Sequence, residues 1–260
     1  MGVYEVKDRQ SIAPLFAGWE ETFIWSYLQG CMGKAYASGD SPVESALILT
    51  GDFCCLAGRA CRELLEDQQI WEGKGFVILV PQSGEWSEMI EKCLGCRAVR
   101  RERYALKKEG DLFDREKLLN IVNGIREPYE IRMIDEEIFH EALASGWAQD
   151  LCSQFEDYDD YKRRGLGAAV LKHGELVSGA SSYIVYREGI EIEIDTREDE
   201  RRKGLALACG AKLILECLER GLYPSWDAHN LGSLRLAEKL GYHFDKAYPA
   251  YEVSFLLSEG

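Results

Sequence analysis

The chain lacks any apolar run long enough to cross a membrane, and its first residues lack the basic-then-apolar order of a secretory signal peptide. Val6 stands where an N-myristoylation signal requires Ser or Thr, so Gly2 is not expected to carry a lipid. Basic stripes that could neutralise nucleic-acid phosphates are also missing, and the formal net charge is −14. We therefore expect a cytoplasmic protein without a membrane or nucleic-acid partner.

Several catalytic signatures are absent as well. No Gly-x-Ser-x-Gly nucleophile elbow occurs, which argues against hydrolase chemistry. The segment Gly165-Leu166-Gly167 lacks the third glycine of a dinucleotide-binding fingerprint. The only Cys-x-x-Cys, Cys93 to Cys96, has no second pair or His cluster beside it, so we expect no metal site. The nine cysteines are odd in number and lie in apolar contexts, which is typical of reduced core residues.

What is present is an ordinary globular composition, with 46% hydrophobic and 29% charged residues in 260. That length allows two modest domains or one large one. A charged segment begins at Gly110, and a helical pattern ends at Gly124 shortly before Pro128. We therefore predict an N-terminal mixed α/β domain over 1–125 and a second domain over 126–260.

The first domain shows a short ordered pattern of elements. Residues 46–50 and 53–58 predict a hairpin, 75–81 a buried strand, 85–94 a helix closed by Gly95, and 97–106 an extended segment. The order strand, helix, glycine, strand occurs again in residues 223–253. We hypothesise that the first domain is a degenerate, partial copy of the second.

The second domain contains the most informative stretch of the chain. Strands are predicted at 129–134, 167–171, 176–186 and 190–196, and the last of these alternates strictly between apolar and polar residues. Arg201-Arg202-Lys203-Gly204-Leu205-Ala206 then joins this strand to an apolar helix that runs to about Leu218. Such a turn offers unpaired N–H groups, a glycine that permits close approach and three cations, so it predicts a pyrophosphate cradle. An ordinary strand-to-helix turn with solvated charges is the alternative.

A second strand and helix follow the cradle. Tyr223 to Ala228 predicts a short strand, Asn230 an N-cap, and Gly241 the residue that ends a helix with an apolar stripe. This order of elements, with Arg-x-x-Gly-x-Ala in the first helix and Leu-Gly-Tyr after the second, resembles the GNAT superfamily of N-acetyltransferases. Within that superfamily the sequence is most similar to the branch of zwittermicin A resistance acetyltransferase-like proteins.

The resemblance implies an α/β (α+β) fold with a mixed, mostly antiparallel sheet flanked by helices. It also implies acetyl-CoA as co-substrate, with the pyrophosphate on backbone amides of the cradle and the pantetheine arm along the strand that ends at Thr196. Asn230 and Ser233 match positions that commonly touch the cofactor, although Asn230 is equally a plain N-cap. The expected cofactor-binding residues are Ile194, Asp195, Thr196, Arg201, Arg202, Lys203, Gly204, Leu205, Ala206, Asn230 and Ser233.

Direct attack of an amine on a thioester requires a base, because an amine is mostly protonated at neutral pH. Glu191 and Glu193 are the leading candidates, since alternation places both on one face of the strand. Many GNAT enzymes carry a tyrosine that protonates the leaving thiolate, and the matching position here is Ala237. Tyr242 is a substitute general acid, although a tyrosine after a helix end is more often a packing residue.

We expect Trp226 and Asp227 to contribute to an acceptor pocket for an ammonium group. The sequence thus predicts an N-acetyltransferase that acts on a primary amine of a small molecule and needs no metal. Two alternatives stay open: a CoA-binding sensor or interaction module that has lost catalysis, for which Ala237 is the sequence hint, and a protein or peptide N-acetyltransferase. Fold alone does not name the acceptor.

Overall fold

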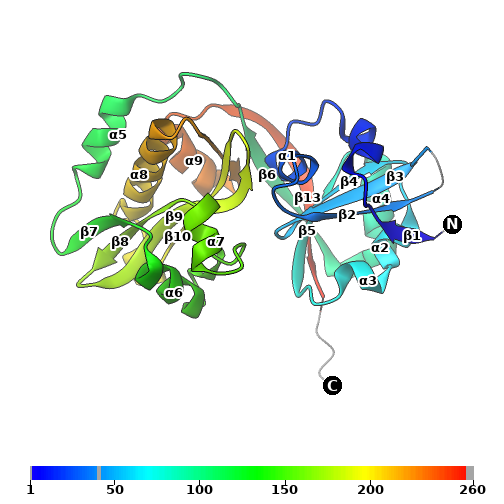
Figure 1. Ribbon diagram of the computed structural model, residues 1–260, viewed down its shortest axis with the longest axis horizontal. Coiled ribbons are helices and arrows are strands. Elements are labelled where there is room, and N and C mark those ends of the chain that lie inside the picture. The colour runs from blue at the N-terminus through cyan, green and yellow to red at the C-terminus, as the bar shows by residue number, and fades with distance from the viewer. Residues whose placement is uncertain (1, 40–41, 256–260) are drawn as a thin grey trace. The chain divides into compact units, whose positions relative to one another are not determined.

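The computed structural model describes residues 2–39 and 42–255, which form two compact units (Figure 1). Unit 1 contains the chain up to Arg103 and the C-terminal segment from Tyr248, and unit 2 contains Tyr104–Ala247. The division therefore differs from the predicted ranges 1–125 and 126–260, because the segment around residues 104–125 packs with unit 2. No helix within the described residues is long and apolar enough to cross a membrane.

Unit 1 is built around one sheet whose strands run in the order β1-β2-β3-β4-β5-β13-β6. Neighbouring strands from β1 to β4 are antiparallel, whereas β4 and β5 are parallel. The strands are β1 (Val3–Glu5), β2 (Lys34–Ser38), β3 (Ser45–Thr50), β4 (Phe53–Gly58), β5 (Phe76–Pro81), β6 (Ala98–Leu106) and β13 (Phe244–Ser254), and the helices are α1 (Thr22–Leu28), α2 (Arg62–Glu66), α3 (Gln68–Trp71) and α4 (Gly84–Leu94).

The predicted hairpin, strand, helix and strand of this unit all occur. Helix α4 begins where the Ser83 side chain accepts a hydrogen bond from the Trp86 amide, and it ends at Gly95, whose φ is 53°. Trp86 is fully buried and donates its indole N–H to the Gly58 carbonyl at 2.9 Å, which ties the helix to the end of β4. A polar indole atom is thereby satisfied inside the core.

Unit 2 contains a second sheet, of order β11-β10-β9-β8-β7, in which only β10 and β11 are parallel. Its strands are β7 (Tyr129–Met133), β8 (Gly167–Lys172), β9 (Glu175–Tyr186), β10 (Gly189–Thr196) and β11 (Tyr223–Ser225). Strand β12 (Asp227–Ala228) is not part of this sheet and pairs with β6. Its helices are α5 (Arg115–Val122), α6 (Glu136–Ala144), α7 (Tyr158–Arg164), α8 (Leu205–Glu219) and α9 (Leu231–Leu240), with short 3-10 turns η4 (Gln149–Leu151) and η5 (Glu198–Glu200). The mixed, mostly antiparallel sheet flanked by helices that the sequence predicts is confirmed.

Helices cover both faces of this sheet. Figure 1 shows α5, α8 and α9 on one side of the strands and α6 and α7 on the other. Side-chain alternation produces the two layers: in β8, Ala168 and Val170 pack under α8, whereas Ala169 and Leu171 pack with the residues of α6. In β10, Ile190 and Ile192 point into the α8 layer. Helix α8 is apolar because it lies between the sheet and α5.

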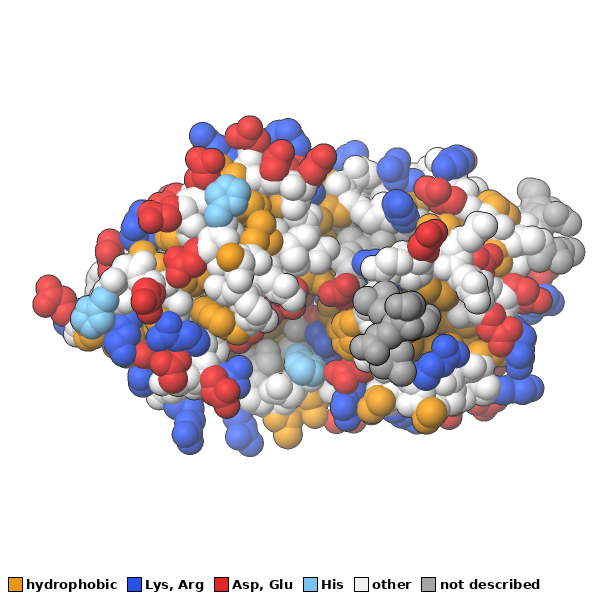
Figure 2. All heavy atoms as spheres, turned by 90° about the horizontal axis from the view of Figure 1, so that it is seen from below, with side chains coloured by type: hydrophobic (Ala, Val, Ile, Leu, Met, Phe, Trp, Pro, Cys, Tyr) orange, Lys and Arg blue, Asp and Glu red, His pale blue; other side chains and the backbone are white. Residues whose placement is uncertain are grey.

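One face of the molecule carries charges of both signs without a stripe of one sign. On the face drawn in Figure 2, Lys and Arg side chains are interspersed with Asp and Glu side chains. Most of the ion pairs on unit 2 are local, such as Lys212 with Glu216 at 2.6 Å on α8 and Arg197 with Asp199 at 2.8 Å. On this face, therefore, the acidic side chains are not gathered in one patch.

The first prediction concerns the start of β10. A Cβ at Gly189 would lie 2.1 Å from the Tyr223 carbonyl oxygen, a backbone atom at the pairing with β11. We expect Gly189→Ala to lower the free energy of unfolding by about 1–3 kcal/mol, the usual cost of overpacking. The control is Gly146→Ala, where a Cβ meets nothing within 4 Å. Equal denaturation midpoints for the two variants in urea would contradict this account of the close approach.

Candidate functional site

The central feature of unit 2 is that β10 and β11 pair only at their beginnings. The parallel register joins Gly189 to Tyr223, Ile190 to Pro224 and Glu191 to Ser225, and it ends there. Within the described residues, β10 has only β9 and β11 as neighbours in its sheet, so no strand lies beside it on the β11 side from Ile192 onward. After Ser225 the chain continues as β12, which pairs instead with β6 through Asp227 and Ala105. An open strand edge of this kind can accept an extended ligand.

The register of β10 against β9 also changes where β10 and β11 separate. Glu191 is opposite Ile184 on β9, but Ile192 is opposite Ser182, so Tyr183 is the extra residue of a bulge. Bulges re-aim side chains and are frequent beside functional sites. The bulge and the end of the β11 pairing thus coincide at Glu191.

The predicted cradle lies directly beyond this open edge. Arg202 and Gly204 both have left-handed backbone conformations, with φ of 61° and 82°, and Gly204 precedes the first residue of α8 without a side-chain cap. A Cβ at Gly204 would meet nothing within 4 Å, so the space above this turn is open. The loop from Arg201 to Gly204 is exposed, whereas Leu205 is buried in the core. The first amides of α8 therefore face an accessible position that favours an anion.

A buried carboxylate that the sequence analysis did not identify holds the loop in place. Glu200, which is 1% exposed, accepts hydrogen bonds from Lys172 at 2.6 Å, Lys203 at 2.7 Å and the Tyr129 hydroxyl at 2.7 Å. Strands β7 and β8 thereby bind the loop through one side chain. Nothing in the run Glu198-Asp199-Glu200 distinguishes this residue from its neighbours, because burial depends on contacts with distant strands.

The charges of this cluster stabilise one another. Hydrogen bonds from Lys172, Lys203 and Tyr129 lower the pKa of Glu200 to about 2, and the bond to Glu200 raises the pKa of Lys203. Lys203 is thus engaged by a protein carboxylate. Of the three predicted cradle cations, Arg202 is the one that makes no ion pair within the described residues.

Arg201 fastens the loop to the end of β10. Its Nε donates to the Thr196 carbonyl at 3.1 Å, and its guanidinium lies 4.0 Å from the Asp195 carboxylate. Asp195 accepts a hydrogen bond from the Thr196 amide at 2.7 Å, and burial raises the pKa of its carboxyl. The Thr196 hydroxyl is bonded to Ser178 at 2.7 Å. The predicted contact residues at the strand end therefore form a connected, fixed group.

The remaining predicted cofactor residues lie on α9 and in the core. The Asn230 side chain accepts a hydrogen bond from the Ser233 amide at 2.9 Å, which is the N-cap geometry. Ser233 is partly buried one turn into the helix. Ile194 packs against the α8 layer, where its Cδ1 and the Leu240 side chain crowd Gly210.

The two predicted bases share a face of β10. Because Ile190 and Ile192 belong to the core under α8 and Ile194 packs against it, the alternating Glu191 and Glu193 lie on the opposite face. Glu191 is 5% exposed and Glu193 is half-buried. The charge of Glu191 contributes to the raised pKa values of Tyr186, Tyr223 and Tyr242, after burial as the main cause.

Tyr242 and Trp226 are core residues. Tyr242 is 2% exposed and donates its hydroxyl to the Pro224 carbonyl, and burial raises its pKa well above the usual value. Trp226 is 6% exposed and meets Tyr242 edge to face at 5.7 Å. Asp227, the next residue, is partly exposed on β12. Ala237, at the position of the family tyrosine, is fully buried.

Among the described residues, no group of three or more His, Cys, Asp or Glu side chains is arranged to hold a metal ion. All nine cysteines are free thiols, and burial raises the pKa of the Cys209 and Cys217 thiols on α8 to about 12. These thiols are inert packing residues at neutral pH.

Comparisons with known proteins agree with this arrangement. A family model described as GNAT acetyltransferase matches residues 13–251. The uncharacterized N-acetyltransferase YdfB of Bacillus subtilis (strain 168) is 27% identical over 245 residues, which cover 88% of this chain and 89% of the relative. A GCN5-related N-acetyltransferase-like protein from Streptococcus suis 89/1591 has a crystal structure that matches 95% of this chain and 98% of its own, with 47% identity and a TM-score of 0.90. A tandem GNAT protein from the clavulanic acid biosynthesis pathway shares the fold, at 10% identity and a TM-score of 0.57 over 97% of this chain and 98% of its own.

The second prediction tests the Glu200 cluster by its pH dependence. The folded-state pKa of about 2 lies below the ordinary 4.5, so the stabilisation is complete above pH 4.5 and is lost as the pH falls from there to about 2. We expect Glu200→Gln to lower the melting temperature at pH 7, and the difference from the wild type to shrink below pH 4.5.

The control for this measurement is Glu175→Gln, because Glu175 is 75% exposed and reaches Arg197 only at 3.5 Å. This variant should melt close to the wild type at every pH. A Glu200→Gln variant as stable as the wild type at pH 7 would show that the cluster does not stabilise the loop.

Proposed function

Because the chain belongs to the GNAT acetyltransferase family, we propose that it transfers the acetyl group of acetyl-CoA to a primary amine of a small molecule. The protein is an acyltransferase, and GNAT enzymes use acetyl-CoA as co-substrate. The proposal concerns the acceptor and the residues that carry the reaction.

One observation supports the proposal most directly: the open edge of β10 ends at Thr196, and the short loop that follows it ends at the start of α8. The strand edge beyond Glu191, which β11 does not cover, suits the amide groups of a pantetheine arm, which can lie along it as an added strand. The amides after Gly204 suit a pyrophosphate at the end of that arm. A ligand with a long amide-bearing arm and a diphosphate fits both features at once.

The reaction requires a proton acceptor close to the thioester. In the proposed step the amine nitrogen bonds to the acetyl carbon, the carbon–sulfur bond breaks, and the thiolate leaves and takes a proton from water. Glu191 or Glu193 removes the proton that the amine loses. The position of Glu191 at the bulge, where β10 and β11 part, favours it over Glu193. Tyr242 is a weaker candidate for the general acid, because its hydroxyl is bonded to Pro224.

We propose that the acceptor carries an amine because of the negative charge of Asp227. Asp227 follows the buried Trp226 and is partly exposed, so its negative charge lies where it can attract an ammonium group, while Trp226 supports it from the core. An inactive CoA-binding sensor is the second candidate, and Ala237 in place of the family tyrosine favours it. Turnover with free amines but not with peptides would favour the small-molecule enzyme over peptide acetylation.

We also propose that unit 1 is a degenerate copy of unit 2. Three antiparallel strands and a parallel fourth, β2 to β5, repeat the order of β8 to β11. A helix that ends at a glycine with a positive φ follows in each unit, at Gly95 and Gly241. Unit 1 has only the short α2 and α3 where unit 2 has the 15-residue α8. A single cofactor site per chain is the consequence.

The branch of the family and the cellular location are proposed from the sequence. We propose a likeness to the branch of zwittermicin A resistance acetyltransferase-like proteins, which rests on four segments: Glu191 to Ile194, Arg201 to Ala206, Pro224 to Asp227 and Leu236 to Tyr242. A reducing, cytoplasmic location is supported by the nine free cysteines, several of which are buried in apolar cores.

The third prediction tests the cradle. Gly204→Glu places a bulky anion at the first turn of α8 and should abolish acetyl-CoA binding, while the wild type binds one equivalent per chain. The control is Gly221→Glu at the other end of the same helix, because Gly221 has a comparable φ of 68° and equally open surroundings. Calorimetry measures affinity and stoichiometry together. Equal binding by Gly204→Glu and Gly221→Glu would refute the cradle.

The fourth prediction concerns the base. We expect either Glu191→Gln or Glu193→Gln to reduce kcat/KM by about a hundredfold and to remove the acidic limb of its pH profile, because the amide cannot accept the proton. Glu238→Gln, on the exposed surface of α9, serves as the control. Unchanged profiles for both strand variants would exclude both carboxylates.

A further inference from the structure

Ser178 of β9 is a buried hydroxyl residue that lies behind the end of β10. It is fully buried and is paired with Thr196, the last residue of β10. On its other side it is opposite Val170 of β8, which packs in the α8 layer. Residues directly opposite each other on neighbouring strands share a face of the sheet, so Ser178 faces α8 as well. Its hydroxyl is therefore placed between the end of β10 and the helix that follows.

The Ser178 hydroxyl makes hydrogen bonds to both of these elements. Its Oγ donates to the Asp195 carbonyl at 3.1 Å and lies 2.7 Å from the Thr196 hydroxyl. Because a hydroxyl has one proton and two lone pairs, Thr196 donates the second of these bonds. In the second turn of α8, burial raises the pKa of the Cys209 thiol to about 12, and a hydrogen bond with Ser178 opposes this rise. One side chain thus contacts the last two residues of β10 and the start of α8.

The backbone of β9 also extends its pairing with β10 at this point. The register between β8 and β9 is irregular just before Ser178, where Val177 is an extra residue. The Val177 carbonyl accepts a hydrogen bond from the Arg197 amide at 2.9 Å. Bulges are frequent beside functional sites, where they re-aim the chain. The bonds from β9 therefore continue past Thr196 to the first residue of the loop before α8.

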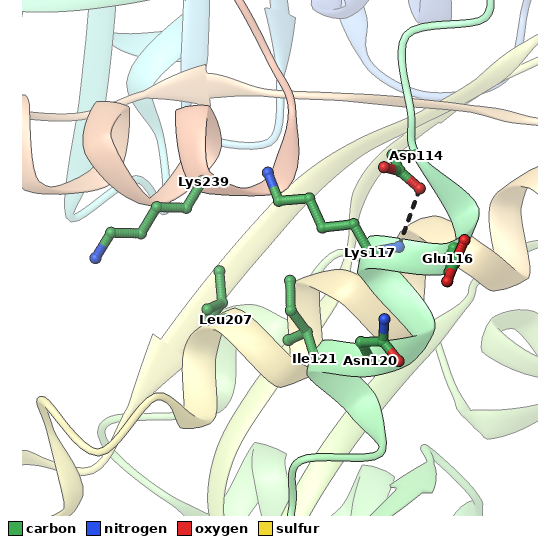
Figure 3. Close-up of a pocket in the computed structure, with 7 residues that line it drawn as sticks. All are labelled: Asp114, Glu116, Lys117, Asn120, Ile121, Leu207 and Lys239. Carbon is green, nitrogen blue, oxygen red and sulfur yellow. Dashed lines mark hydrogen bonds between the residues drawn. The ribbon is translucent and has the colours of Figure 1, made fainter.

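The start of α8 has different surroundings on its two sides. Leu207, in the first turn, lines a pocket of about 640 Å³ together with residues of α5 and α9 (Figure 3). Around Leu207 the helix start thus borders open space, whereas Cys209 is fully buried beside β9. The contacts with β9 are therefore well placed to fix the start of α8 relative to the end of β10.

We propose that Ser178 is a positioning residue of the acetyl-CoA site, which fixes the spacing between the open edge of β10 and the first amides of α8. The inference rests on the proposed function, in which the pantetheine arm lies along that edge and the pyrophosphate lies on those amides. CoA is one molecule that must reach both places, so its affinity depends on their spacing. A ligand that occupies only one of the two places does not depend on it.

The experiment compares CoA with its two halves. CoA spans both places, pantetheine provides the arm alone, and adenosine 5′-diphosphate provides the diphosphate without the arm. Calorimetry measures the affinity for CoA, and NMR titration of the isotope-labelled protein measures the weaker binding of the halves. The proteins are the wild type, Ser178→Ala, Thr196→Val and Ser181→Ala, and the melting temperature of each is recorded.

Ser181→Ala is the matched control. Ser181 is on the same strand and is also fully buried, and its hydroxyl lies 2.8 Å from the Tyr161 hydroxyl of α7, on the face away from α8. The variant removes a buried hydrogen bond of the same kind. Thr196→Val is the second test variant, because it removes the bond to Ser178 and nearly keeps the side-chain volume. It decides the question if Ser178→Ala does not fold.

We expect Ser178→Ala to bind CoA about tenfold more weakly than the wild type, the size of the loss of one buried hydrogen-bond partner. Its affinities for pantetheine and for adenosine 5′-diphosphate should be unchanged. Thr196→Val should lose part of the affinity for CoA, and Ser181→Ala should lose none. A purely structural role would instead lower the melting temperature of Ser178→Ala and weaken all three ligands alike.

The outcomes separate the positioning role from the proposed function. If Ser178→Ala binds CoA like the wild type, or loses affinity equally for CoA and both halves, the positioning role is overturned and the acetyltransferase proposal stands. An equal loss of CoA affinity in Ser178→Ala and Ser181→Ala has the same meaning, and it decides where a half binds too weakly to be measured. Failure of the wild type to bind CoA overturns the proposed function, and the positioning role of Ser178 with it.

Discussion

The parting of β10 from β11 is the constraint on which the site depends. Two parallel strands that begin in register at Gly189 and Tyr223 separate after Glu191 because the chain beyond Ser225 turns to pair with β6. The separation leaves backbone donors and acceptors of β10 without strand partners, which is unfavourable unless water or a ligand satisfies them. The open edge, the bulge opposite Glu191 and the start of α8 all follow from this one change of pairing.

A second set of interactions fixes the loop that follows the open edge of β10. The loop between β10 and α8 carries seven consecutive charged residues, from Arg197 to Lys203, and most of them would otherwise be solvated and mobile. Glu200 is drawn into the protein by Lys172 and Tyr129 from neighbouring strands, and Arg201 is bound to the Thr196 carbonyl. A preorganised loop presents the amides of α8 without a further entropic cost when an anion binds. Charge in this loop therefore serves structure first, and Arg202 is the cation left for a ligand.

Unit 1 is made of two separate stretches of the chain, so a single boundary in the sequence does not divide the two units. Strand β6 begins in unit 1 and ends in unit 2, and β13 begins in unit 2 and ends in unit 1. A boundary near residue 126 follows from a local glycine and proline signal, yet Leu118 and Ile121 of α5 belong to the core of unit 2. Local signals mark where a helix ends, whereas membership of a core depends on which apolar faces meet.

Sequence alone determined the elements that depend on local rules. The alternation of Ile190 to Thr196, the N-cap at Asn230 and the glycines at 204 and 241 predicted a strand, two helices and their ends, because periodicity and φ preferences act within a few residues. Tertiary structure alone decided the roles of side chains. Trp226 and Tyr242 pack in the core, and Glu200 rather than its acidic neighbours is buried. Burial and proximity arise from contacts between residues far apart in the chain, and no local pattern encodes them.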